Sequence, residues 1–292
     1  MRFVVFIGVL LLIAGCTKEV DLVQPSYEPK IVVDGYIETG KAANVFLTMS
    51  SPYLTHYDSA SIRNTFLNHA KITISTSDGE EEVLTLYREN RFFPPFVYKS
   101  VALRGRVGVE YFLEVEVRGQ ILRSVTTIPA APVVLNAFFE QVSDTTANLE
   151  MEIEPRQDED TYLFTRVKSR LAGESFHPSY NPVDVVKSSD LSPWRSQIMR
   201  SSEFGLYYLN AEEYFYNDYD RYVYDLRDTV DVIAGAVDSV SYRVLSSLFR
   251  DRINQENPFS FNGNRIETNI EGGIGRWTGI GISGVIYVSS EN

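Results

Sequence analysis

The feature that most constrains the fold is a series of short segments in which apolar and polar residues alternate. Examples are Ile31–Ile37, Asn44–Ser50 and Ala70–Ser75, and Glu82–Tyr87 adds the return strand of a hairpin whose turn contains Gly79. Alternation places every second side chain on one face of an extended strand, whereas a helix needs a period near 3.6. The 18 Tyr and 17 Phe residues also favour strands. The sequence therefore predicts a mainly β fold.

One turn and the strand after it indicate the kind of β fold. A turn containing Gly105 and Gly108 leads to Tyr111, the first residue of the alternating segment Tyr111–Val117. This arrangement resembles the tyrosine corner of immunoglobulin-like and fibronectin-like sandwiches, in which the tyrosine hydroxyl bonds back to the preceding turn. We therefore expect an N-terminal Ig-like β-sandwich over residues 27–130, with Ile121–Ile128 as its last strand.

A second domain is expected from residue 131 to residue 292. Pro129 and Pro132 end the first domain, because proline cannot donate to a strand ladder and restricts the residue before it. The segment 171–202 is rich in Ser, Pro and Asn without clear periodicity, and it is predicted to be a long insertion loop. The remainder predicts a second antiparallel β domain, whose expected strands are Val133–Phe139, Ala147–Ile153, Tyr162–Lys168, Arg265–Ile270 and Gly279–Ser289.

Helical periodicity is clear once, near residues 238–254. Apolar residues recur there at spacings of three and four, Asp238 or Ser241 can cap the start, and Pro258 prevents continuation. A weaker helix is expected over Ala211–Arg221. The predicted helix in the C-terminal half should pack one broad face on a sheet.

The N-terminus has the features of a secretory leader. Arg2 supplies one positive charge, and the apolar run Phe3–Ala14 is too short for a stable membrane-spanning helix, which needs about 20 residues. The run ends in Ile-Ala-Gly-Cys, which resembles a bacterial lipoprotein signal. This pattern predicts a signal peptide over residues 1–15, lipidation of Cys16 and a flexible tether over 16–26. Cys16 is the only cysteine in the chain.

Several short motifs together resemble one known family. They are the leader with Cys16, the Val-Val-Asp-Gly-Tyr-Ile run at Val32, the Thr-Met-Ser-Ser-Pro run at Thr48, the tyrosine corner and the glycine-rich segment Thr268–Gly279. The chain resembles the domain of unknown function 4249 family of Bacteroidota outer-membrane lipoproteins, often encoded beside TonB-dependent receptors. The resemblance implies an outer-membrane location and implies no reaction.

Two residues after the cysteine bear on the side of the membrane that the protein faces. Lys18 and Glu19 resemble the lysine-acidic signal by which such bacteria export lipoproteins to the cell surface. The resemblance therefore implies a lipid-anchored, surface-facing protein. The net charge of −12 argues against nucleic acid as a partner.

The sequence offers little support for catalysis or a cofactor. His56, His69 and His177 are scattered, and no glycine-flanked serine elbow is present. Gly279–Gly284 has the spacing of a dinucleotide loop, but too few residues follow it to form the required helix. The glycines there are instead expected in a late strand and turn where backbones pack closely. We expect no catalytic residues, no metal and no cofactor.

Acidic clusters leave calcium as an alternative to that expectation. One cluster is Asp158, Glu159 and Asp160, and the second consists of Asp218, Asp220, Asp225, Asp228 and Asp231. Neither cluster has the spacing of a calcium loop that wraps one ion. Solvated turns are the simpler interpretation of both.

The candidate binding residues are tyrosines in an aromatic segment. Tyr214, Tyr216, Tyr219 and Tyr222 lie among acidic residues that would keep an exposed patch soluble. Tyrosine combines an apolar ring with a hydrogen-bonding tip, which suits glycan or peptide ligands. The alternative is that these rings are buried against a sheet or helix.

The leading functional hypothesis is a noncatalytic outer-membrane lipoprotein, surface-exposed, that binds a ligand or nutrient or is an accessory to a TonB-dependent transporter. One alternative is a cell-surface hydrolase whose site is built from insertion loops. A third is an adhesion or structural surface protein.

Overall fold

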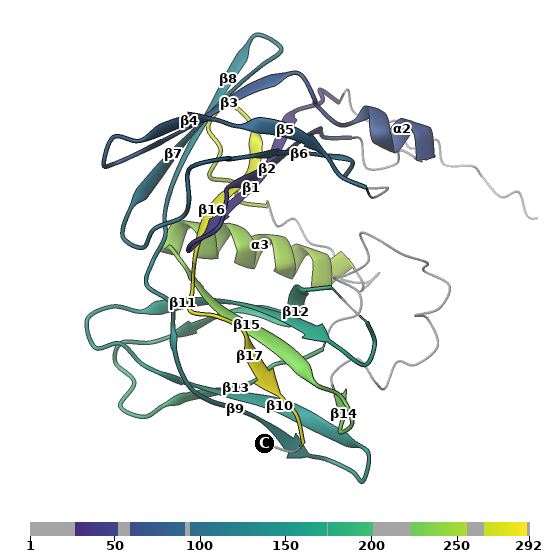
Figure 1. Ribbon diagram of the computed structural model, residues 1–292, viewed down its shortest axis with the longest axis vertical. Helices are drawn as coiled ribbons and strands as arrows, with labels where there is room; N and C mark the ends of the chain where they lie inside the picture. Colours follow the sequence, from purple (N-terminus) through teal and green to yellow (C-terminus); the bar gives the residue numbers. More distant parts are fainter. Residues whose placement is uncertain are drawn as a thin grey trace, which may run out of the picture.

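The chain folds into two β-rich halves with one long helix between them (Figure 1). The computed structural model describes residues 27–51, 59–90, 94–173, 175–200, 223–255 and 266–290. The prediction of a mainly β fold is confirmed. Two helices are described, α2 (Ser59–Asn64) and α3 (Ser239–Gln255), and α3 is the one between the halves.

A nine-stranded main sheet runs through both halves. We call the sheet above it in Figure 1 the upper sheet and the one below it the lower sheet. The main sheet has the order β12 (His177–Val186), β11 (Thr161–Ser169), β15 (Val230–Val237), β16 (Ile274–Ile282), β1 (Ile31–Glu38), β2 (Asn44–Met49), β6 (Phe96–Lys99) and β5 (Thr85–Arg88), with β17 (Ile286–Val288) paired to β15. The upper sheet has the order β4 (Glu81–Val83), β3 (Ala70–Thr76), β7 (Glu110–Val117) and β8 (Gln120–Thr127). In the lower sheet, β10 (Thr146–Glu154) lies between β9 (Val133–Gln141) on one side and β13 (Trp194–Gln197) and β14 (Tyr224–Asp225) on the other.

The upper half is a sandwich of the upper sheet and the β1–β2 end of the main sheet. Val33 and Val45 of the main sheet share one buried core with Ile74 and Leu113 of the upper sheet. Trp277 of β16 is also fully buried in this core. Each strand contributes every second side chain to the core, which is the alternation seen in the sequence.

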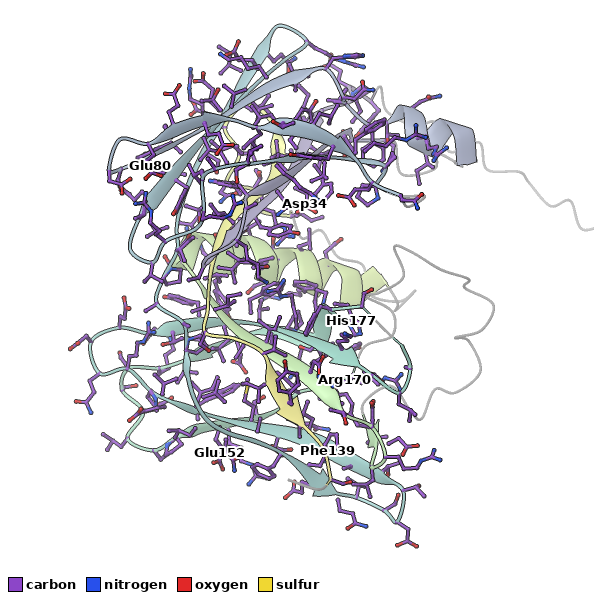
Figure 2. All side chains as sticks on the ribbon, in the orientation of Figure 1. Asp34, Glu80, Phe139, Glu152, Arg170 and His177 are labelled. Carbon is purple, nitrogen blue, oxygen red and sulfur yellow. The ribbon has the colours of Figure 1, made fainter. Side chains whose placement is uncertain are left out.

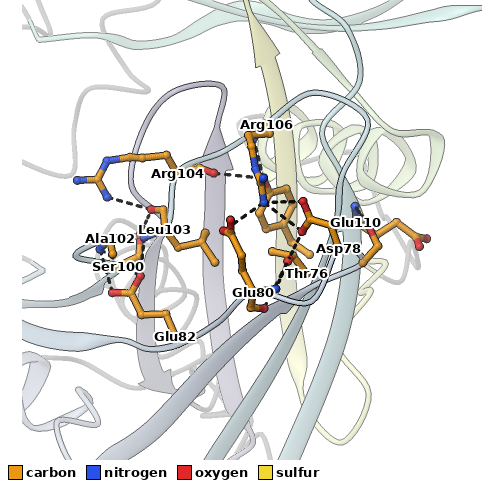
Figure 3. Close-up of polar contacts among 12 residues, drawn as sticks. Thr76, Asp78, Glu80, Glu82, Ser100, Ala102, Leu103, Arg104, Arg106 and Glu110 are labelled. Carbon is orange, nitrogen blue, oxygen red and sulfur yellow. Dashed lines mark hydrogen bonds and ion pairs between the residues drawn. The ribbon is translucent and has the colours of Figure 1, made fainter.

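The predicted tyrosine corner is present. The Tyr111 hydroxyl accepts a hydrogen bond from the Arg106 backbone N–H at 2.6 Å and donates to the Arg104 carbonyl at 3.3 Å (Figure 3). Tyr111 is fully buried, so its hydroxyl has exchanged water for backbone partners in the preceding turn. This local motif fixes the start of β7 against the turn.

The predicted hairpin strand Glu82–Tyr87 divides between two sheets. Its first part is β4, which pairs with β3, and its second part is β5, which pairs with β6 of the main sheet. Leu84 lies at the crossing, where it is buried and its N–H bonds to the Ile72 carbonyl at 2.8 Å. The prediction of one continuous strand was therefore wrong, because the chain passes from one layer of the sandwich to the other.

The lower half packs the lower sheet on the β11–β15 end of the main sheet. Its core contains Leu149 and Met151 of β10, Leu163 of β11 and Val232 of β15. Figure 2 shows Phe139 of β9 against the same layer. The chain enters this half after Pro129–Pro132, where the boundary between domains was predicted.

Strand β16 belongs to both halves. It runs parallel to β1, with Gly35 opposite Trp277, and its other end pairs antiparallel with β15. The core of the residue range 27–130 therefore includes a tryptophan from near the C-terminus. The division into domains at residue 130 stays a prediction, and the structure adds that one sheet spans the two ranges.

Two other segments differ from expectation. The prediction of a long insertion loop over residues 171–202 was wrong, because this segment contains β12 and β13. Pro178 and Pro182 lie within β12 and interrupt the residue pattern that is typical of a strand. Arg265–Ile270 was expected to be a strand, and residues 266–270 form none. Gly279–Ser289 divides into β16, which begins earlier at Ile274, and β17.

The late glycines pack as predicted. A Cβ on Gly279 would lie 2.6 Å from the Thr127 carbonyl oxygen, and one on Gly281 would collide with the Pro129 carbonyl. Any larger residue would push β16 away from the chain that leaves β8. This confirms that the glycines are there because backbones pack closely, as predicted, and not because they form a dinucleotide loop.

The long helix begins as predicted. One carboxylate oxygen of Asp238 accepts the Ser241 backbone N–H at 2.7 Å, which caps the first turn of α3. The other oxygen accepts the hydroxyl of Thr126 in β8 at 2.5 Å. Leu245 and Phe249 pack between the halves against Phe164 and Ile280. The helix expected over Ala211–Arg221 and the stop at Pro258 lie outside the described residues.

Candidate binding groove

The residues selected from the sequence as functional lie outside the described part of the chain. This applies to Cys16, Lys18 and Glu19 and to the candidate binding tyrosines Tyr214, Tyr216, Tyr219 and Tyr222. Their roles stay predictions. Tyr224, which follows this segment, is buried, and its ring centroid lies 5.9 Å from that of Phe139.

The described residues form a groove at a different place, on the outer face of the upper sheet. Its volume is about 700 Å³, and it is open to solvent along the sheet. The floor consists of outward-facing side chains of β3, β7 and β8, and residues of α3 and of the segment 269–271 add to the lining. Three different parts of the sequence therefore contribute to one surface.

Apolar side chains lie in the groove where outward positions are usually polar. Phe112 of β7 is directly opposite Ser75 on one neighbouring strand and Val125 on the other. Phe112 is 42 % exposed, Val125 47 % and Val240 of α3 41 %. An aromatic ring with half its surface free, flanked by two aliphatic side chains, is a surface on which a ligand can stack.

Polar side chains surround this apolar centre. Hydroxyls come from Thr73, Ser75 and Ser124. The charged lining residues are Lys71, Glu81, Glu114, Arg123 and Glu271. Arg123 contacts Glu114 at 2.8 Å, and Lys71 contacts Glu116, beside the groove, at 2.8 Å. Such exposed pairs contribute little stability. They do leave the groove without a concentrated charge of one sign.

The wall beside β8 is fixed by hydrogen bonds. Arg123 and Glu271 exchange two backbone hydrogen bonds, at 3.1 and 2.8 Å. The Asn269 side chain accepts the Trp277 N–H at 2.9 Å and donates to the Trp277 carbonyl at 2.7 Å. The Ser124 hydroxyl donates to the Asn269 carbonyl at 2.7 Å. Part of the glycine-rich segment Thr268–Gly279 thus ties the wall of the groove to the sheet.

A buried charged group connects the halves but is not part of the groove. Glu38 is 2 % exposed, and it contacts Arg166 at 2.6 Å and Lys41 at 2.8 Å. Burial alone would raise the pKa of Glu38, but Arg166 and Lys41 outweigh it and hold the pKa below its usual value. Burial, reinforced by Glu38, raises the pKa of Tyr36 nearby. This arrangement joins β1 to β11 with an ion pair.

Five of the described residues in the acidic clusters considered for calcium contact protein groups. Asp160 accepts hydrogen bonds from Lys187 and Ser188, which lower its pKa to about 2. Arg227 lowers the pKa of Asp225 to about 2 in the same way. Glu159 contacts Arg156, Asp228 accepts from Ser169, and Asp231 contacts Arg170. Asp218 and Asp220 lie outside the described residues.

Metal-binding geometry is not found in the described ranges. No three His, Cys, Asp or Glu side chains come together there in a way that could hold an ion. The Nδ1 of His177 lies 3.0 Å from the Pro178 carbonyl, His69 is exposed, and His56 is outside those ranges. None of the described helices has the length and apolar character to span a bilayer.

Sequence reasoning missed the groove although the sequence holds a signal for it. In Tyr111–Val117 and Ile121–Ile128, the outward positions include Phe112, Ile121 and Val125 among charged residues. Apolar residues at outward positions of a strand indicate a surface with a partner. The signal was overlooked because the alternation was used to identify the buried face only.

The fold and groove define a class: a mainly β protein with an open, mixed apolar and polar groove and no assigned reaction. In the comparison with protein families, the model for a domain of unknown function, DUF4249, matches residues 17–282. The chain belongs to this family. No curated protein matches the chain. The resemblance noted from the sequence motifs is therefore confirmed for the family, while its lipoprotein and Bacteroidota attributes stay predictions.

Proposed function

We propose that this chain is a noncatalytic lipoprotein, anchored by Cys16 to the outer membrane and facing the cell surface, that binds a ligand in the groove of the upper sheet. The observation that carries the proposal is the exposed Phe112 at the centre of a groove of about 700 Å³. Rigid strands hold the ring in place, so binding would cost little ordering of the protein.

The chemistry of the groove favours an uncharged, hydroxyl-rich ligand such as a short glycan. The Phe112 ring can stack on the apolar face of a sugar, and the hydroxyls of Thr73 and Ser75 lie beside it. A charged ligand would have to compete with the pairs Arg123–Glu114 and Lys71–Glu116. A short peptide is the alternative ligand, and the experiment below distinguishes the two.

The binding test uses the purified full chain on panels of glycans and of short peptides. Binding to glycans, with at least a tenfold weaker Kd for Phe112→Ala, is the expected result, which corresponds to about 1.4 kcal/mol. Ile121→Ala is the matched control, because Ile121, 51 % exposed, lies on the same sheet but is not among the residues that line the groove. Both variants should unfold within about 0.5 kcal/mol of the parent chain.

The results decide between specific alternatives. Binding to peptides alone would replace the glycan assignment. Equal loss in Phe112→Ala and Ile121→Ala, or no binding on either panel, would contradict the groove as the site. Turnover of any ligand on the panels would instead support the cell-surface hydrolase.

The anchor is proposed from the leader and from the extent of the family match, which begins at Thr17, directly after Cys16. Cys16→Ser should leave the protein unprocessed or without lipid, so metabolic labelling with a radioactive fatty acid should label the parent chain and not the variant. Equal labelling of both would contradict lipid anchoring at Cys16.

The surface location is tested separately by protease treatment of intact cells. The protein should be digested from outside, and exchange of Lys18 and Glu19 for alanine should protect it. Digestion only after the outer membrane is opened would place the protein in the periplasm.

The proposed role as an accessory to a TonB-dependent transporter has its own test. Affinity purification of the lipid-anchored protein from membranes should recover an outer-membrane receptor at near-stoichiometric levels. Recovery of the protein alone would remove this role while leaving ligand binding intact. An adhesion role would instead be indicated by loss of cell attachment on deletion.

A further inference from the structure

We infer that strand β9 is an interface through which two copies of this chain pair as antiparallel strands. β9 has nine residues, Val133–Gln141, and pairs with β10 along one edge. Its other edge pairs with no strand in the part of the chain that the structure describes. An unpaired strand edge presents a row of backbone donors and acceptors to a further strand.

Among the described residues, the other strand edges are short or protected, which distinguishes β9 from them. β4, β5, β13 and β14 have two to four residues each. β12 is long, but Pro178 and Pro182 interrupt its donors. The edge of β8 is covered by the backbone pairing of Arg123 with Glu271. β9 contains no proline, lysine or arginine, and Glu140 is its one charged residue.

A bulge limits the pairing surface to the second part of β9. The register with β10 shifts between Glu152 and Ile153, so Leu135 is an extra residue on β9. This explains why Val134 and Ala137 both face the core although they are three residues apart. The stretch from Asn136 to Gln141 is regular and can accept a partner strand.

This stretch is complementary to itself in one antiparallel register. With Phe138 opposite its own copy, Glu140 lies opposite Asn136, an amide that can donate to the carboxylate. On the inner face, the small Ala137 lies opposite the large Phe139. A one-residue shift would mix inner and outer faces. Registers that place Glu140 opposite itself would oppose two like charges.

A second copy is therefore the occupant that the strand itself specifies. The outward aromatic Phe138 is already oriented by Arg195, whose guanidinium carbon lies 5.1 Å from the ring centroid. The pair would join two lower sheets into one continuous sheet across a twofold axis. Five or six residue pairs make a small interface, so the dimer should be weak and concentration-dependent.

Cysteine cross-linking tests the contact and its register together. The full chain carrying Cys16→Ser has no other cysteine, so an added one reports alone. Paired residues in antiparallel strands have Cα atoms about 4.5 to 5.5 Å apart, a separation that a disulfide can span. Phe138→Cys should form a covalent dimer with mild oxidant. Asn136→Cys and Glu140→Cys should do so only when mixed.

Controls and a second measurement make the outcome decisive. Ser189→Cys, exposed on a loop of the same half, should stay monomeric. By sedimentation equilibrium, Phe138→Lys should weaken dimerisation at least tenfold, while Leu191→Lys, at another exposed residue, should not. A monomer at all concentrations, with no cross-link from Phe138→Cys or from the mixture, overturns the proposal. Cross-linking of Asn136→Cys or Glu140→Cys alone overturns the register.

Discussion

The two sandwiches expose different parts of their outer sheets. The upper sheet has covered or short edges and an outer face with exposed Phe112 and Val125. The lower sheet has an outer face on which polar groups bind one another: Arg195 contacts Glu150 and Glu140, both at 3.2 Å. The edge of its strand β9 that faces away from β10 pairs with no strand within the described residues. One half therefore offers side chains to a partner, and the other offers backbone.

This difference suggests separate uses of the two halves. A face of side chains can select a ligand by shape and by hydrogen-bonding groups, whereas a strand edge selects chiefly for another strand. The main sheet connects both, through the parallel pairing of β1 and β16 and the antiparallel pairing of β16 with β15.

The largest effect is expected from Trp277→Ala. Trp277 is fully buried in the upper core, and its Nε1 donates to the Tyr111 carbonyl at 2.9 Å. Loss of such a ring costs about 3 to 5 kcal/mol of unfolding free energy. Urea unfolding followed by circular dichroism measures it. Trp194→Ala, at a half-buried residue of the lower half, is the matched control and should cost less.

The same variant tests whether the halves unfold together. Trp194 is then the only tryptophan left, so its fluorescence reports the lower half alone. Because the main sheet crosses both halves, we expect its midpoint to fall to lower urea along with the circular dichroism. An unchanged fluorescence midpoint would show that the two halves are independent units, in agreement with the predicted division at residue 130.

A somewhat smaller effect is expected from Glu38→Gln, which breaks the buried pair between the halves. Arg166 would keep its charge while two of its nitrogens, Nε and Nη2, are already buried without a hydrogen-bond partner. Removal of one member of a buried pair costs about 3 to 5 kcal/mol, and we expect the lower end of that range because Gln keeps an amide oxygen that can accept from Arg166. Thermal unfolding measures the loss. The double variant with Glu38→Leu and Arg166→Leu should recover much of it, and no recovery would argue against an uncompensated charge as the cause.

The pH dependence of the Glu38 effect has a definite sign. The pKa of Glu38 is lowered in the folded chain. Its ionised form therefore stabilises the fold at every pH above the usual pKa of a glutamate. That contribution is lost as the pH falls through the lowered pKa. The difference between the parent chain and Glu38→Gln should therefore shrink in acid, and a difference that grows would contradict this assignment.

An intermediate effect is expected at the junction of β8 with the start of α3. Asp238→Ala removes the cap on Ser241 and the acceptor for Thr126, at a cost of about 1 to 2 kcal/mol. Asp238→Asn keeps an oxygen acceptor for the Ser241 N–H and should lose less. Urea unfolding compares the two variants. Equal losses would mean that the carboxylate charge, and not the cap, stabilises this junction.

Sequence predicted the parts of the fold that local chemistry decides. Tyr111 was identified because its hydroxyl bonds to a turn only a few residues away, and Asp238 because a helix cap needs one side chain. The crossing at Leu84 was missed, because the residues on both sides suit a strand and only packing decides which sheet each joins. The β1–β16 pairing joins segments about 240 residues apart and leaves no local signal.

The candidate site was harder to predict than the fold. The groove needs the register that sets Phe112 beside Val125, and it needs α3 to bring Val240 to the same surface. Neither relation can be read from one segment of sequence. The tyrosines chosen instead, Tyr214 to Tyr222, were selected by composition, and the described residues do not test them.

The smallest loss of stability is expected from substitution of Glu82 or Asp160, two carboxylates that each accept hydrogen bonds from a loop. In the upper half, Glu82 accepts backbone N–H groups of Val101, Ala102 and Leu103 (Figure 3), which outweigh burial and lower its pKa. In the lower half, Asp160 accepts from Lys187 and Ser188, which lower its pKa to about 2. Both contributions should be present at neutral pH and be lost in acid.

The sign follows from the folded and unfolded pKa values. The pKa of Asp160 is 3.8 in the unfolded chain and about 2 in the folded one, so its contribution is complete above about pH 5 and is lost as the pH falls toward 2. Asp160→Asn should therefore lower the urea midpoint at pH 5 and not at pH 2. Glu82→Gln should follow the same course. A midpoint that is lowered equally at both pH values would show that geometry, and not ionisation, holds these loops.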